Sequence, residues 1–236
     1  MRHLKSICHD ISIHPMTLVY IGLTMICGLF QEYIMALSIV LIHELCHLLM
    51  AYYFTFDIEK VQILPFGAYL YISDYKNHSI IEEMCVVLAG PCSHLFMHIG
   101  IILFINGEMQ IQMLSINYAI FVFNLAPIYP LDGNRLIGLM LQRVMDLQKA
   151  FYLQLKISIF VLCIICIFYI RISTIVILLY LFYWQLLFYK NIPYYLWEYY
   201  QSDVNKMKKP VLHYDLSYIR DRQNYYVVKG KVYNQK

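Results

Sequence analysis

Two histidines and a glutamate have the types and spacing of a zinc site. His43, Glu44 and His47 form the pattern H-E-x-x-H. Because residues four apart lie on one face of a helix, His43 and His47 can present two imidazoles to one Zn²⁺. Glu44 then lies one residue further round the helix, beside the metal. The spacing predicts a zinc site; the alternative is a hydrogen-bonded polar cluster that joins helices.

A second group of residues can complete this centre. Asn124 is followed by Leu-Ala-Pro-Ile-Tyr-Pro-Leu-Asp-Gly, in which Pro127 and Pro130 interrupt any helix because proline donates no backbone hydrogen bond. A catalytic zinc takes three protein ligands and keeps one position open. Asp132 directly follows the break and is the candidate third ligand. The alternative is that Asp132 and Gly133 form an ordinary turn at the end of a helix.

The composition indicates that membrane helices position these residues. Apolar residues make up 61% of the 236 residues, charged residues make up 14%, and the mean hydropathy is +0.57. Soluble domains carry about 45–50% apolar and about 25% charged residues, and disordered chains carry less apolar sequence still. The net charge of +3 is too small to indicate nucleic-acid binding. The sequence therefore predicts an all-α polytopic membrane protein, with the lipid bilayer as its surroundings.

About six segments reach or nearly reach the length and apolar character needed to cross a bilayer, about 17–25 residues in a helix, and the first, fourth and fifth are short. The second holds H-E-x-x-H, and the fourth ends at the proline break. The expected spans are 15–30, 34–54, 81–105, 114–130, 157–170 and 172–189. We expect residues 1–190 to form the membrane domain and residues 191–236 to form a short basic tail.

Positive charge predicts the orientation of these spans. With six spans, the segments before, between and after them alternate between the two sides of the membrane. Every Lys and Arg except Arg171 falls on the side that holds both termini. Because cytoplasmic loops are enriched in Lys and Arg, we expect both termini to be cytoplasmic.

Three connecting segments have patterns of their own. Residues 61–73 contain β-favouring residues on both sides of Gly67, which predicts a membrane-associated β-hairpin that could offer an edge strand to an extended substrate. Residues 134–153 have apolar positions at helical spacing, which predicts an amphipathic helix. Residues 224–234 predict a short hairpin in the tail.

The two motifs, in this order and topology, resemble the site-2 protease family of intramembrane zinc metalloproteases. The resemblance covers roughly residues 15–190, and it implies zinc ligation by His43, His47 and Asp132. It also implies that Glu44 is the general base, and that Asn124 orients the substrate carbonyl or the water.

Within that family, the small size, the hairpin and the basic tail are most similar to sporulation members. This similarity implies a membrane-tethered pro-sigma factor as substrate and inhibitory membrane proteins as partners. Alternative substrates are anti-sigma factors and remnants of signal peptides. Alternative functions of another class are a catalytically silent membrane scaffold and a metal transporter.

Other polar residues in the spans have simpler explanations. His94 and His98 are also four residues apart, but no glutamate lies between them and no partner motif follows. We expect them to make hydrogen bonds between helices, with a place in the active-site cavity or a metal site as alternatives. Gly90 is expected to allow close helix approach. Cys46 is expected to pack, although a nearby thiol could also bind zinc or respond to oxidants.

Overall fold

The computed structural model describes residues 11–13, 15–64, 67–72, 77–169, 172–200, 210–213, 218–221, 223–228 and 231–234. The chain divides into two compact units. The first comprises residues 1–75 and 85–124, and the second comprises residues 76–84 and 125–236. One helix, α4, begins in the second unit and continues in the first.

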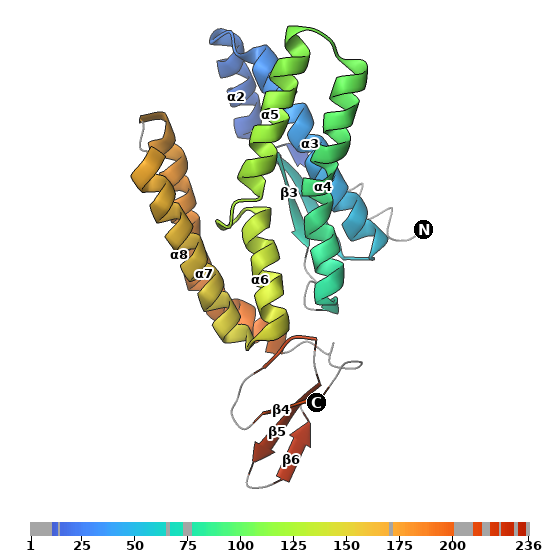
Figure 1. The fold of residues 1–236 in the computed structure, drawn as a ribbon, viewed down its shortest axis with the longest axis vertical. Helices are drawn as coiled ribbons and strands as arrows, with labels where there is room; N and C mark the ends of the chain where they lie inside the picture. Colours follow the sequence, from blue (N-terminus) through green and yellow to red (C-terminus); the bar gives the residue numbers. More distant parts are fainter. Residues whose placement is uncertain are drawn as a thin grey trace. The chain divides into compact units, whose positions relative to one another are not determined.

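The first unit contains the helices α2 to α5 and a three-stranded sheet (Figure 1). Strand β2 pairs in parallel with β1 and antiparallel with β3, and Leu64 lies opposite Gly67. The hairpin predicted over residues 61–73 is thereby confirmed, and β3 forms an edge of the described sheet. The bounds are β1 Ile11–Ile13, α2 Pro15–Ile26, α3 Phe30–Tyr53, β2 Ile58–Leu64, β3 Gly67–Ile72, α4 Ile80–Phe104 and α5 Glu108–Asn124.

Two glycines allow tight turns between successive helices of this unit. Gly28 lies between α2 and α3, and Gly107 lies between α4 and α5, with φ angles of +72° and +74°. Glycine adopts positive φ with little strain because it lacks a Cβ. Because the second turn is so short, α5 begins at Glu108, six residues before the expected fourth span.

The second unit contains α6, α7, α8 and a second three-stranded sheet. Helices α7 and α8 pack side by side (Figure 1). Strands β5 and β6 pair antiparallel, which confirms the hairpin predicted at 224–234. The bounds are α6 Asp132–Val144, α7 Leu147–Tyr169, α8 Ile172–Tyr200, β4 Pro210–His213, β5 Gln223–Val228 and β6 Lys231–Asn234.

The amphipathic helix expected over residues 134–153 is two helices instead. Helix α6 ends at Val144, and α7 begins at Leu147. Asp146 separates them, because its Oδ2 accepts a hydrogen bond from the backbone N–H of Lys149 at 3.3 Å, as an N-terminal capping residue does. The spanning helix expected to begin at residue 157 therefore starts ten residues earlier.

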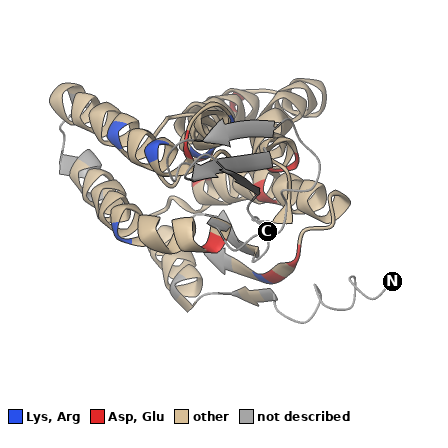
Figure 2. Cartoon of the chain, turned by 90° about the horizontal axis from the view of Figure 1, so that it is seen from below, with Lys and Arg blue, Asp and Glu red and all other residues tan. Residues whose placement is uncertain are grey.

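Three of the described helices are long and apolar enough to cross a membrane. They are Phe30–Tyr53, Ile80–Phe104 and Leu147–Phe168. Figure 2 shows that charged residues are sparse along the described helices. Many large apolar side chains on these helices are exposed, such as Phe104 and Phe168. Lipid rather than water is the solvent that suits such surfaces, so the chain is a membrane protein.

A buried arginine joins several parts of the second unit. The Arg220 guanidinium forms an ion pair with the Glu83 carboxylate at the start of α4, and both side chains are 3% exposed. It also donates hydrogen bonds to Gln142 Oε1 at 3.1 Å and to the His78 carbonyl at 3.0 Å. Its Cζ lies 4.5 Å from the centroid of the Tyr199 ring, in cation–π geometry. Arg220 therefore connects the C-terminal segment to α4, α6 and α8.

Replacing Arg220 with methionine is expected to lower the free energy of unfolding by about 3–5 kcal/mol, because a buried carboxylate then loses its partner. Burial alone would lower the pKa of Arg220, but Glu83 beside it raises that pKa above its ordinary value. The guanidinium therefore stays charged. Denaturant unfolding of the full chain in detergent measures the change.

The matched control for this variant is Arg143→Met, which removes an exposed guanidinium from the same unit. Adding Glu83→Gln to Arg220→Met is expected to recover part of the lost free energy of unfolding, because no unpaired charge then remains buried. Equal stability of the Arg220 and Arg143 variants would contradict the assigned role.

Candidate active site

Helix α3 brings the two histidines of the H-E-x-x-H motif together. Their Nε2 atoms lie 3.0 Å apart, and the centroids of their rings lie 4.7 Å apart. The His43 side chain is 2% exposed and the His47 side chain is 7% exposed. One turn of helix separates the two residues, so both imidazoles point from the same face of α3, as the sequence predicts.

The outer nitrogens of both rings have partners on α4. His47 Nδ1 lies 2.8 Å from the backbone carbonyl oxygen of Val86, and His43 Nδ1 lies 3.0 Å from His94 Nε2. A carbonyl oxygen can only accept, so His47 Nδ1 carries the proton. In a neutral imidazole the other nitrogen, Nε2, then carries a lone pair that is available to a metal.

Gly90 lets α4 approach the two histidines. A Cβ built on Gly90 would collide with the imidazole rings of both His43 and His47. A side chain at this position is therefore incompatible with the observed positions of the two rings. This confirms the expectation that Gly90 permits close helix approach.

The donor set on α3 fits zinc. Two nitrogen ligands of a tetrahedral Zn²⁺ at the usual bond length lie about 3.3 Å apart, close to the observed separation of 3.0 Å. Lone pairs facing each other at this distance repel, and a cation bound to both relieves the repulsion. Imidazole nitrogen is also a preferred ligand of zinc.

In the second unit, Asp132 is the first residue of α6, where an acidic side chain interacts favourably with the helix dipole. Gly133 packs so closely on the Leu125 carbonyl that a Cβ would collide with it. Asn134 is fully buried, and its Nδ2 donates to the Pro127 carbonyl at 3.2 Å. These contacts fix the start of α6 against the proline-containing loop.

Polar side chains of α7 and α8 support the same loop. Ser158 Oγ accepts from the Tyr129 N–H at 2.9 Å, and Gln185 Nε2 donates to the Tyr129 carbonyl at 2.8 Å. Ser158 Oγ in turn donates to Gln185 Oε1 at 2.8 Å. Non-helical backbone at membrane depth needs such partners within the protein. Sequence reasoning missed both residues, although a polar residue inside an apolar span is itself a signal.

The other predicted residues lie as follows. Glu44 directly follows His43 on α3 and is partly buried. Asn124 is the last residue of α5 and is also partly buried. His94 makes the expected hydrogen bonds between helices, whereas the His98 side chain is exposed. The pair of histidines on α4 therefore does not converge on one metal.

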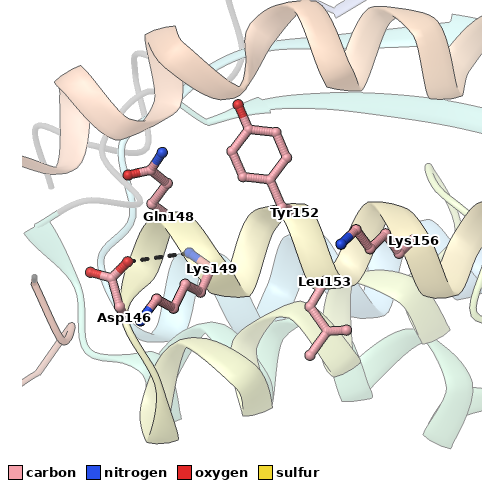
Figure 3. Close-up of a pocket in the computed structure, with 6 residues that line it drawn as sticks. All are labelled: Asp146, Gln148, Lys149, Tyr152, Leu153 and Lys156. Carbon is pink, nitrogen blue, oxygen red and sulfur yellow. Dashed lines mark hydrogen bonds between the residues drawn. The ribbon is translucent and has the colours of Figure 1, made fainter.

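A pocket of about 490 Å³ lies along the first turns of α7 in the second unit. The dashed line in Figure 3 is the bond that Asp146 accepts from the Lys149 backbone. None of the predicted site residues lines this pocket, so we assign it no part in catalysis. Its lining residues are Asp146, Gln148, Lys149, Tyr152, Leu153 and Lys156.

Known proteins similar to this chain include zinc metalloproteases. Residues 32–112 match Peptidase family M50. The chain is 33% identical to stage IV sporulation protein FB of Bacillus subtilis (strain 168) over 153 residues, which are 63% of this chain and 53% of that protein. It is 31% identical to zinc metalloprotease MJ0392 of Methanocaldococcus jannaschii over 114 residues, 44% of this chain and 32% of that protein. The chain thus spans about half the length, or less, of these curated relatives.

The fold has a counterpart among solved structures. The site-2 protease from Methanocaldococcus jannaschii superposes with a TM-score of 0.58 at 21% identity, covering 75% of this chain and 90% of that one. This likeness shows the fold. The match of residues 32–112 to Peptidase family M50 covers the H-E-x-x-H motif on α3.

Proposed function

We propose that this chain is an intramembrane zinc metalloprotease that cleaves a membrane-tethered substrate near the cytoplasmic face. The observation that carries the proposal is the buried pair His43 and His47, whose Nε2 atoms lie 3.0 Å apart. The match of residues 32–112 to Peptidase family M50 supports the same activity. A buried ionisable pair within a spanning helix is unfavourable unless it serves a function.

We assign zinc ligation to His43, His47 and Asp132, which leaves a fourth position open as catalytic zinc requires. When bound, zinc supplies a Lewis acid that polarises the scissile carbonyl and activates water. The Glu44 carboxylate accepts a proton from the attacking water as its oxygen bonds to the carbonyl carbon. Glu44 then donates this proton to the amide nitrogen as the C–N bond breaks. Asn124 would orient the substrate carbonyl or the water by hydrogen bonding.

The assignment of Asp132 as a zinc ligand predicts that its replacement lowers the affinity for zinc. Replacing Asp132 with alanine is expected to weaken zinc binding at least about 100-fold, because one of three protein ligands is removed. Competition with a chelator, using the purified full chain in detergent, measures the affinity. Asp57→Ala is the control, since it removes an exposed carboxylate from another loop. Zinc affinity equal to that of the control would exclude Asp132 as a ligand.

The substrate we propose is a pro-sigma factor, released from the membrane during sporulation. The similarity to stage IV sporulation protein FB supports this choice. Inhibitory membrane proteins would then act as partners that hold the protease inactive.

Co-expression in a heterologous bacterium tests the substrate. The chain is expressed with the pro-sigma factor of its own genome, and an immunoblot follows the processed form. Processing by the wild type, and not by an inactive variant, is the expected result. Absence of processing with both proteins in the membrane would contradict the pro-sigma assignment. Anti-sigma factors and signal-peptide remnants, tested in parallel, are the other substrates the family resemblance suggests.

We further propose six membrane spans with both termini in the cytoplasm. In addition to the three long apolar helices, α2, α5 and α8 would cross the bilayer. The distribution of Lys and Arg supports this orientation. A reporter that is active only in the cytoplasm, fused after Lys236, should be active. An inactive reporter on a stably inserted protein would contradict this orientation.

A further inference from the structure

A chain of buried polar contacts within the first unit begins at the candidate zinc ligand His43. His43 Nδ1 lies 3.0 Å from His94 Nε2, and His94 Nδ1 lies 2.7 Å from Asn117 Oδ1. The three side chains are 2%, 2% and 3% exposed. They come from three helices, α3, α4 and α5, so helix packing holds the chain of contacts together.

Asn117 determines the direction of every hydrogen bond in this chain. Its Nδ2 donates to the backbone carbonyl of His94 at 3.1 Å, and only the amide nitrogen can make that bond. Its Oδ1 therefore faces His94 Nδ1 and must accept a proton from it. A neutral His94 then has a lone pair on Nε2, which accepts the Nδ1–H of His43.

The hydrogen bond from His43 Nδ1 to His94 Nε2 determines which nitrogen of His43 can bind a metal. With Nδ1 protonated, a neutral His43 carries its lone pair on Nε2, the atom that faces His47 Nε2. The Val86 carbonyl imposes the same arrangement on His47. The two rings thus reach matching tautomers by different means: a backbone oxygen for His47 and two further side chains for His43.

We propose that His94 and Asn117 are positioning residues for the zinc site, which fix the ring orientation and tautomer of His43. His94 does not serve as a ligand, because both of its ring nitrogens are used in hydrogen bonds. Phe121 packs against the His94 ring, with centroids 5.7 Å apart, and limits its rotation. The proposal rests on the zinc site of the proposed function and adds residues outside the motif.

Zinc affinity of the purified full chain, measured by competition with a chelator, tests the proposal without use of a substrate. His94→Phe keeps the aromatic ring and removes both nitrogens. We expect about 10–100-fold weaker binding, the usual effect of losing a partner of a metal-bound histidine. Asn117→Leu, similar in size but without an acceptor, should weaken binding in the same direction.

Two further variants separate positioning from a general effect on the fold. His94→Gln offers an amide oxygen to the Nδ1–H of His43 and is expected to restore most of the affinity lost in His94→Phe. His98→Phe changes an exposed histidine one turn along the same helix and is expected to bind zinc as the wild type does. If His94→Phe does not fold, the zinc affinity of His94→Gln is compared with that of Asn117→Leu, and the first is expected to be the higher.

The visible spectrum of the Co²⁺-loaded protein gives a second readout, because it reports the geometry of the ligands. We expect an altered spectrum for His94→Phe and Asn117→Leu and a nearly native one for His94→Gln. Wild-type affinity and spectrum in folded His94→Phe and Asn117→Leu would overturn the proposal while leaving the zinc site intact. Failure of the wild type to bind zinc would instead overturn the proposed function.

Discussion

Replacing Glu44 with glutamine is expected to lower the rate of substrate cleavage by about 10²–10⁴-fold, the usual contribution of a general base. The amide has nearly the same size as the carboxylate but cannot accept the proton of the attacking water. Zinc binding should change little, because Glu44 is not among the proposed ligands. The measurement compares cleavage of a membrane-tethered substrate with the zinc content of the same purified samples.

Glu32→Gln is the matched control for this variant. Glu32 lies in the first turn of the same helix and is exposed, so its replacement should leave cleavage unchanged. If Glu44→Gln cleaved as fast as this control, Glu44 would have no part in the chemistry. A non-catalytic scaffold, with cleavage by a host protease, would then explain the observations better.

Replacing Gly90 with alanine is expected to weaken zinc binding by about tenfold or more, although Gly90 itself binds nothing. The added methyl group would collide with the imidazoles of His43 and His47. Overpacking of this kind costs about 1–3 kcal/mol, and about 1.4 kcal/mol corresponds to a tenfold change in affinity. The rings must move apart or α4 must move away, and both disturb the metal ligands.

Gly100 provides the control for this prediction. It lies on the same helix, and a Cβ there meets no atom within 4 Å. Gly100→Ala should therefore bind zinc as the wild type does and should unfold at a similar temperature. Equal affinities of the two alanine variants would show that the close approach at Gly90 is not needed for zinc binding.

The sequence was informative where spacing alone determines geometry. Four residues of helix place His43 and His47 on one face, and the structure has them there. The β-hairpin around Gly67 is equally local, since its two strands are joined by a short turn. For Asp132, the sequence predicts a helix break, and the structure begins α6 at this residue.

The sequence was less informative where distant residues interact. The sequence predicts too late a start for α7, because the cap formed by Asp146 lies within a stretch whose apolar spacing fits one amphipathic helix. Ser158 and Gln185 are separated by 27 residues, and their common partner Tyr129 is still further away along the chain. The polar types of these residues indicate that each has a partner, but only the packing of α7 and α8 shows which one.

Titration of the metal-free chain with Zn²⁺ tests the central claim most directly. The purified protein, stripped of metal and reconstituted with a membrane-tethered substrate in lipid vesicles, receives zinc in small steps while cleavage is followed. The proposed mechanism predicts that cleavage is absent at first, rises with added zinc and saturates at one zinc per chain. Cleavage by the metal-free chain at the full rate would contradict it.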